Sequence, residues 1–208
     1  MFLIFTIILF IVTFKMDNSI RIPELMKYAR ENYPKLPYHN FSHAMDVYFA
    51  TKDYSRYYFL CDNDRLILES SAILHDIVYV PFQEGNEEKS AERSAKILKT
   101  LEYSISERNK INNLIIATKW PTNPTNLLEE IICDCDLDNL SREDFFEKSE
   151  LLMKEWGIQK DYSWYYKQLE FLENNHYYTH YAQLYKQPGK EKNILFLKNI
   201  LTNNLQHI

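Results

Sequence analysis

Residues 71–79 read Ser-Ala-Ile-Leu-His-Asp-Ile-Val-Tyr, and they place a histidine and an aspartate at the end of a strongly apolar segment. The segment begins near Asn63 or Asp64, and its apolar residues recur at helical spacing, which predicts a buried helix. An ionised aspartate is costly to bury at such a place unless a cation or hydrogen-bond donors compensate its charge. The adjacent His75 and Asp76 are therefore candidates for metal binding.

The rest of the chain also has helical periodicity, and strand-like alternation is nearly absent. Residues 81–85 and 121–124 have the composition of loops. A sequence close to a capping box at residues 141–144 predicts a helix start there. The expected helices cover residues 22–33, a segment from residue 40, a segment from 63 or 64 to 78, and residues 87–101, 106–120, 127–137, 141–156, 162–172 and 194–205. The pattern predicts an all-α single domain.

Composition excludes several classes of protein. The chain has 208 residues, 46% of them hydrophobic and 25% charged, as in a globular domain with a sizeable core. Only three glycines are present, too few for a glycine-rich nucleotide-binding loop. The net charge is -5 and no Lys/Arg-rich run occurs, so we expect no long nucleic acid as a partner. Three cysteines without a C-x-x-C motif indicate a reduced, cytoplasmic setting.

The first residues differ from the rest, because residues 1–14 are almost wholly apolar. As a helix they would span ~21 Å, short of the ~30 Å bilayer core. Three interpretations stay open: a membrane anchor with Lys15 at the interface, an apolar helix docked on the domain, or translation from a start upstream of Met16. We therefore divide the chain into an apolar segment, 1–15, and a helical domain, 16–208, with membrane contact through residues 1–14 as one alternative.

Two further groups of polar residues accompany His75 and Asp76. His39 and His43 stand four residues apart, and Asn40 is a plausible N-cap for the helix that carries His43. Residues 133–138 read Cys-Asp-Cys-Asp-Leu-Asp, so an aspartate stands at every second position at the end of another apolar run. This run lacks the glycine and the final glutamate of an EF-hand loop. Each group alone is a weak signal, but their order along the chain is informative.

The order of His43, His75-Asp76 and Asp136 resembles the H…HD…D signature of the HD-domain superfamily of helical metal-dependent phosphohydrolases. From about residue 22 onward the chain is similar to the small bacterial-type predicted HD phosphohydrolases. The matching pieces are residues 38–40 and 43, 75–79, 86–88, 90–91, 117–118, 134–137 and 155–156. Residues 38–47 (YHNFSHAMDV) are also similar to the YHNxxHAxDV segment of class I cyclic nucleotide phosphodiesterases.

This resemblance implies that His43, His75, Asp76 and Asp136 bind one divalent metal ion between the helices of an HD-domain bundle. Two imidazoles and two carboxylates suit Mn²⁺, Fe²⁺, Zn²⁺ or Mg²⁺ and leave room for water and a phosphate oxygen. The ion would acidify water and stabilise charge on phosphorus. Asp134 lies two residues from Asp136, so it is turned ~200° about the helix axis. We expect Asp134 to contact the metal ligands and not the metal itself.

The resemblance also implies catalytic and substrate-binding residues. His39, one turn before His43, matches the residue that protonates the leaving oxygen in the phosphodiesterases, with a hydrogen-bonded supporting role as the other interpretation. Glu87 is expected to orient water, although its place at a helix start also fits simple capping. Asn40 and Lys119 are expected to contact the substrate, and a solvated lysine is the other interpretation for Lys119.

We therefore expect a metal-dependent phosphohydrolase acting on a small phosphate ester, a nucleotide or related metabolite. Two alternatives stay open: a non-catalytic HD module that binds metal or nucleotide, and a cyclic nucleotide phosphodiesterase. Two departures bear on them. Trp120-Pro121 stands where the family tends to have a histidine, and residues 77–80 lack the further histidine that follows HD in the phosphodiesterases. Both departures favour one tightly bound metal over two.

Overall fold

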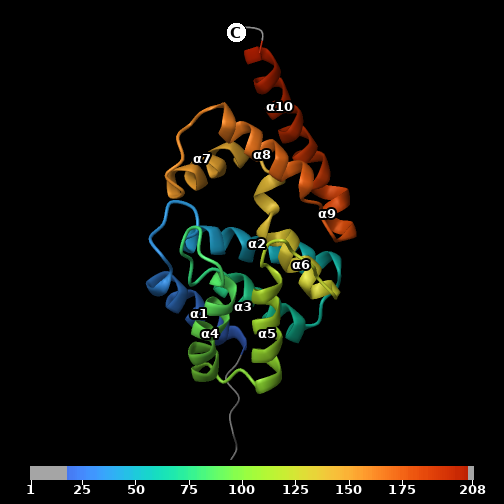
Figure 1. The fold of residues 1–208 in the computed structure, drawn as a ribbon. Coiled ribbons are helices and arrows are strands. Elements are labelled where there is room, and N and C mark those ends of the chain that lie inside the picture. Colours follow the sequence, from blue (N-terminus) through green and yellow to red (C-terminus); the bar gives the residue numbers. More distant parts are fainter. Residues whose placement is uncertain (1–17, 206–208) are drawn as a thin grey trace, which may run out of the picture.

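The computed structural model describes residues 18–205, and every regular element in this part is a helix, which confirms the all-α prediction (Figure 1). The apolar segment 1–15 falls outside this range. The helices are α1 (Asn18–Asn32), α2 (Phe41–Tyr57), α3 (Asp62–Leu74), α4 (Asn86–Thr100), α5 (Ile105–Ala117), α6 (Leu127–Asp136), the short 3-10 helix η1 (Asp138–Ser141), α7 (Phe145–Glu155), α8 (Tyr162–Asn174), α9 (His180–Tyr185) and α10 (Gln187–Leu205).

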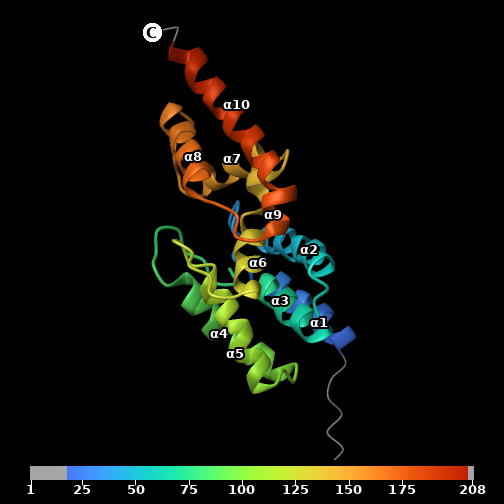
Figure 2. The same cartoon turned by 90° about the vertical axis from the view of Figure 1, so that its right-hand side faces the viewer.

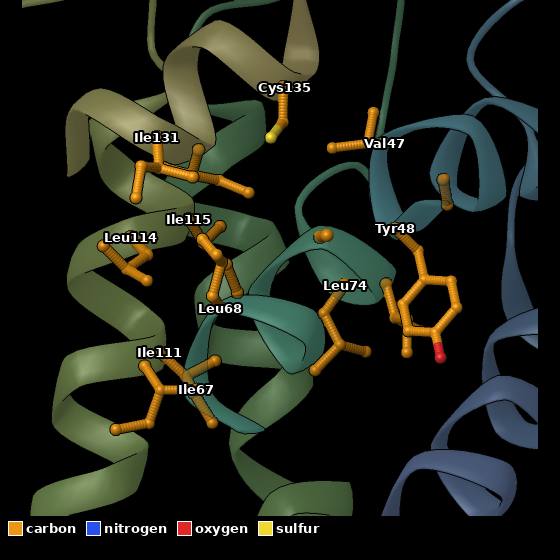
Figure 3. Packing of buried hydrophobic residues seen from close by; sticks show 14 of the residues in the cluster. Val47, Tyr48, Ile67, Leu68, Leu74, Ile111, Leu114, Ile115, Ile131 and Cys135 are labelled. Carbon is orange, nitrogen blue, oxygen red and sulfur yellow. The ribbon is translucent and has the colours of Figure 1, made fainter. Parts of the chain in front are cut away.

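Helix α3 is the centre of the main core. Its residues are buried nearly all round from Leu66 to Leu74, and the helix contacts α1, α2, α5 and α6. A helix that is apolar on every side is stable only when other helices surround it. Figure 3 shows Ile67 and Leu68 of α3 packed among side chains of α5 and α6, with Val47 and Tyr48 of α2 on the other side. This surrounded position holds the end of α3, and thus His75, rigidly.

Side-chain caps fix where several helices begin. Asn40 caps α2 by accepting hydrogen bonds from the backbone N–H groups of Ser42 and His43. Ser104 and Glu107 form a reciprocal capping box at the start of α5. The capping box predicted at residues 141–144 is wrong. There, Asp144 accepts hydrogen bonds from the Arg142 guanidinium, so its carboxylate is engaged away from the helix, and α7 starts only at Phe145.

A second hydrophobic cluster lies apart from the main core. It is built on Leu140, Phe145, Leu172 and Leu197, contributed by η1, α7, α8 and α10. Figures 1 and 2 show α7, α8 and the later part of α10 above the body formed by α1–α6. The chain passes between the two bodies through α6 and η1, and returns through the segment before α9. The region between the two clusters is where a cavity forms.

The return to the main body was only partly predicted. Helix α9 was not predicted, and α10 starts at Gln187, earlier than the predicted residue 194. Pro188 is tolerated because it stands in the first turn, where its missing N–H costs no helical hydrogen bond. Gly189 lies against the carbonyl oxygen of Ser141, a contact that leaves no room for a β-carbon. Over the described range, none of the helices is both long and apolar enough to cross a bilayer.

Candidate metal centre and catalytic cavity

The four side chains predicted as metal ligands meet at one point of the main body. His43 is in the first turn of α2, His75 and Asp76 directly follow α3, and Asp136 is the last residue of α6. One ligand atom from each lies within 4.8 Å of the other three. His43, His75 and Asp76 are buried, and Asp136 is only partly exposed. The folding of three helix ends against each other therefore brings together residues that span 93 positions of sequence.

The spacing of these atoms fits a bound cation. Nε2 of His43 lies 3.1 Å from Oδ1 of Asp136 and 3.3 Å from Nε2 of His75. Nε2 of His75 lies 3.1 Å from Oδ2 of Asp76 and 3.3 Å from Oδ1 of Asp136. An octahedral ion with bonds of about 2.1 Å separates neighbouring ligand atoms by roughly 3.0 Å. Two imidazoles and two carboxylates at this spacing form a donor set for one divalent metal.

The environment of His75 selects the tautomer that metal binding needs. Its Nδ1 lies 2.9 Å from the carbonyl oxygen of Ala72, which can only accept, so Nδ1 carries a hydrogen and donates a hydrogen bond to this oxygen. The lone pair of Nε2 is then directed toward Asp76, His43 and Asp136. A backbone carbonyl that fixes a histidine ring in this way is the usual support of a metal-ligating imidazole. Next to it, the hydroxyl of Tyr33 accepts the backbone N–H of Asp76 at 3.2 Å.

The charges of the cluster also demand a cation. Burial by itself would lower the pKa of His75, but the carboxylates of Asp76 and Asp136 outweigh burial and raise the pKa well above its ordinary value. Burial would raise the pKa of Asp136, but His75 and His43 hold it well below its usual range. Burial lowers the pKa of His43 despite the nearby carboxylates. The carboxylates of Asp76 and Asp136 thus favour positive charge in the site, which a protonated His75 supplies in the absence of an ion and which a bound divalent ion would supply instead.

His39 is held beside the cluster by a residue for which the sequence indicated no role. Its Nδ1 lies 2.5 Å from Oε1 of Glu155, and its ring stacks on Tyr79 with centroids 3.5 Å apart. Glu155, at the end of α7, has a fully buried side chain. Burial would raise the pKa of Glu155, but hydrogen bonds from the His39 ring and from the backbone of His39 and Tyr38 hold it below its ordinary value. The pair resembles the carboxylate–imidazole arrangement that orients a catalytic histidine.

A cavity of about 470 Å³ opens over the cluster between the two bodies. Its floor includes His39, His43, Asp76 and Asp136. Its walls are largely aromatic, and the rings that line it are Tyr38, Tyr79, Trp120, Phe145, Trp156, Trp164 and Phe171. Pockets of this size, apolar with a few converging polar groups, accommodate small organic ligands. The second body therefore supplies the upper wall of the site, which the main body alone would leave open.

The glutamates at the start of α4 face different ways. Glu87 is half-buried and lines the cavity, where burial, helped by Asp76, raises its pKa. Glu88 points to solvent and accepts a hydrogen bond from Nζ of Lys119 at 2.5 Å. Lys119 lines a shallower pocket beside Trp120, not the cavity over the cluster. The structure thus brings Glu87 to the site and places Lys119 in a surface ion pair outside the cavity, and the contact of Lys119 with substrate stays a prediction.

Two other predicted residues have structural roles. The side chain of Asn40 is used in full by the cap of α2, since its amide also donates to the carbonyl oxygens of Leu36 and Pro37. Asn40 is not among the residues that line the cavity, and its contact with substrate stays a prediction. The carboxylate of Asp134 accepts hydrogen bonds from the backbone of Tyr178 and Thr179 and from the Thr179 hydroxyl. These bonds go to the segment before α9, and the support that we expected Asp134 to give the metal ligands stays a prediction.

Several residues of the site were missed because they come from the second body. Lys148, Lys167 and Gln168 line the cavity, as do the aromatic rings of α7 and α8. The only sequence signal for this region was the match of Glu155-Trp156 to the family pattern, and this match assigned neither residue a function. Periodicity predicted α7 and α8 as helices, but it could not show which of their faces turns toward a site on other helices.

Comparison with known proteins agrees with this geometry. A sequence model described as the HD domain matches residues 40–142. The structure of Bacillus subtilis YpgQ in complex with ADP is similar with a TM-score of 0.68 at 12% identity, covering 89% of this chain and 96% of that chain. The structure of LmjPDEB1 in complex with IBMX gives a TM-score of 0.56 at 14% identity, covering 89% and 84%. A search of curated protein sequences finds no match.

At these identities the two structures show a shared fold, whereas the domain match shows the family. The matched range begins at the residue that caps α2 and ends just after η1, so it includes His43, His75, Asp76 and Asp136. The fold, the order of these residues and their convergence at one point agree. The chain belongs to the HD-domain superfamily, whose members are in general metal-dependent hydrolases.

Proposed function

We propose that this protein is a metal-dependent phosphohydrolase that cleaves a small phosphate ester, a nucleotide or a related metabolite. One observation carries the proposal: three residues of the four-donor cluster, His43, Asp76 and Asp136, line a cavity of about 470 Å³ beside the His39–Glu155 pair. The HD domain supports the reaction class. That YpgQ was solved in complex with ADP supports a nucleotide-like substrate.

His43, His75, Asp76 and Asp136 would hold the ion. When bound, a divalent cation polarises the phosphate and acidifies a nearby water. The charge balance of the cluster supports this assignment, because the carboxylates of Asp76 and Asp136 favour a positive partner between them. The protein then has two tasks of its own: to orient the attacking water and to protonate the leaving oxygen.

Each task has a side chain in the cavity. Glu87 orients the water and accepts a proton from it, since a half-buried carboxylate with a raised pKa is a better base than an exposed one. As the water oxygen bonds to phosphorus, the ester P–O bond breaks. His39 gives its Nε2 proton to the departing oxygen, while Glu155 holds Nδ1 and fixes the orientation of the ring. The departing oxygen thus keeps the electron pair of the broken P–O bond and receives its proton from His39.

The test is a panel of phosphate esters assayed with added Mn²⁺, with phosphate and nucleoside products measured. Variants His75→Ala and Asp76→Ala should lose at least about a hundredfold in kcat. His180→Ala is a matched control, because His180 is exposed on α9 and bonds only the hydroxyl of Tyr57 among the described contacts. Unchanged turnover in both cluster variants would reject the proposal.

The same panel separates the two alternatives. A cyclic nucleotide phosphodiesterase is favoured by residues 38–47 and would hydrolyse 3′,5′-cyclic nucleotides faster than linear esters. A non-catalytic HD module would be stabilised by metal or nucleotide without releasing any product. Thermal melting with each ligand, run beside the hydrolysis assay, tells these results apart.

A further inference from the structure

The cations that line the cavity are few. Among the described residues around it, only Lys148 of α7 and Lys167 of α8 carry a permanent positive charge, and no arginine is among them. Sites that bind polyphosphates usually clamp the chain with several arginines or lysines, because each phosphate adds charge that must be neutralised. The lining is therefore poor in the groups that a polyphosphate requires.

One of the two lysines is already engaged. Nζ of Lys148 lies 2.5 Å from Oδ2 of Asp46, which is one turn after His43 on α2. Lys148 is 17% exposed at the side chain and Asp46 is 29% exposed, so this pair is only partly screened by water. Arg142 also approaches Asp46, at 3.6 Å, but it is held by Asp144. The carboxylate of Asp46 thus neutralises the charge of Lys148, which is then less available to a ligand.

The carboxylates that face the cavity oppose further negative charge. Asp76, Asp136 and Glu87 all line it. A bound divalent cation would offset two of these three negative charges and Lys167 would offset the third, so the lining has no surplus positive charge for a ligand. One phosphate group, which carries about −2 at neutral pH, therefore brings less uncompensated charge than a longer phosphate chain. A triphosphate would bring additional charges into a half-enclosed cavity with no cation to receive them.

The aromatic residues that line the cavity indicate the chemistry of the part of the ligand that is not phosphate. The second body contributes Phe145, Trp156, Trp164 and Phe171 to the lining, from α7, its C-cap and α8. Phe145 and Trp164 are almost fully buried, so Trp156 and Phe171 present the more accessible rings. Flat rings in such walls stack well on a planar aromatic group. With the phosphate at the cluster, the body of the ligand lies against these rings.

We propose that the substrate carries a single phosphate group on an aromatic body, and that Asp46 determines this preference by engaging Lys148. The inference rests on the proposed function, since it concerns the same cavity. Asp46 acts through Lys148 and touches neither the ligand nor the cluster, so it is a specificity-determining residue outside the catalytic groups.

The experiment compares kcat/KM for adenosine 5′-mono-, di- and triphosphate and for 4-nitrophenyl phosphate, at a fixed concentration of free Mn²⁺. The wild type should prefer the monophosphate to the triphosphate by about tenfold or more. Asp46→Asn frees Lys148 and should narrow this ratio by about tenfold, which corresponds to about 1.4 kcal/mol. Asp46→Glu keeps the ion pair and should keep the wild-type ratio.

Two more variants test whether the charge of Lys148 causes the change in the kcat/KM ratio. The double variant Asp46→Asn/Lys148→Met should return the ratio to that of the wild type, because the freed charge is removed again. Lys167→Glu changes an exposed residue that lines the cavity, and it should widen the preference for the monophosphate. A folded Asp46→Asn with the wild-type ratio overturns the inference. So does an unchanged ratio in Lys167→Glu if Asp46→Asn fails to fold.

The outcome also distinguishes this inference from the proposed function. If none of the four compounds is hydrolysed, the phosphohydrolase proposal fails and the substrate preference has no basis. If hydrolysis occurs and the triphosphate is the best substrate, the proposed function stands and only the single-phosphate inference is rejected.

Discussion

Glu155 gives the sharpest test of how the second body contributes to catalysis. Its Oε2 accepts hydrogen bonds from the backbone N–H groups of Tyr38 and His39, both at 2.9 Å, and its Oε1 accepts one from Nδ1 of His39 at 2.5 Å. The side chain has no solvent exposure. Glu155→Ala removes both acceptor oxygens and with them all three hydrogen bonds, whereas Glu155→Gln keeps a side-chain oxygen but removes the charge.

The expected loss of stability follows from these three bonds. A buried donor left without its partner costs about 1–3 kcal/mol, and water from the adjacent cavity can replace some of the acceptors. Glu155→Ala should therefore lower the free energy of unfolding by about 3 kcal/mol. Glu155→Gln should lower it by about 1 kcal/mol, since the amide oxygen still accepts from the backbone. Urea denaturation of the three proteins measures both values.

The loss of stability depends on pH in a defined direction. Burial would raise the pKa of Glu155, but the hydrogen bonds from His39 and the backbone hold it below its ordinary value. A depressed folded-state pKa adds stability above the unfolded pKa of about 4.3, and this stability is lost as pH falls through the folded-state pKa. The difference between wild type and Glu155→Gln should thus be largest near pH 7 and shrink below about pH 4.

The activity assay separates proton donation from mere folding. A general acid is worth about 10²–10⁴ in rate when the leaving group is basic. Glu155→Gln should therefore lose about a hundredfold in kcat on an alkyl phosphate ester, and much less on 4-nitrophenyl phosphate, whose leaving group needs no proton. Glu150→Gln is a matched control on the exposed side of the same helix, where Glu150 only pairs with Lys160. Equal losses of kcat on both esters would refute a role in proton transfer.

Other predictions follow from single contacts. Mn²⁺ at a hundred times its Kd should add about 2.7 kcal/mol of stability, a rise in melting temperature of about 5–10 °C for a domain of this size, and His75→Ala should abolish this rise in a thermal melt. Asp134→Ala removes the acceptor that holds the segment before α9 and should cost about 2–4 kcal/mol in urea denaturation. Gly189→Ala would force α10 away from the carbonyl of Ser141, and should cost about 1–3 kcal/mol by the same assay. Ser104→Ala breaks the capping box of α5 and should cost about 1 kcal/mol, seen as a lower midpoint of unfolding.

Local chemistry explains what could be predicted. The apolar run before His75 could only be a core helix, and the loops at residues 81–85 and 121–124 were visible from their composition. Asn40 was identified as an N-cap because the cap depends on neighbouring residues alone. The order of His43, His75-Asp76 and Asp136 pointed to the HD-domain superfamily, and the domain match bears this out.

Residues whose role depends on distant partners were harder to assign. Asp134 and Asp136 are both acidic residues at one helix end, and two residues of helix turn them to opposite sides. Only the packing of α6 shows that Asp136 faces the cluster while Asp134 faces Thr179. Asn40 and Lys119 were expected to contact substrate, but their nearest partners, the cap of α2 and Glu88, already use their polar groups.

The amino-acid sequence alone determined that this protein is helical, that the helix before His75 is buried, and which four residues could bind a metal. These properties depend on periodicity and on the order of residue types, which are written along the chain. The tertiary structure decided that Glu155 holds His39 from 116 residues away and that Lys148 meets Asp46 across 102 residues. Contacts of this kind arise only when the second body closes over the first, because no local interaction encodes which helix faces meet.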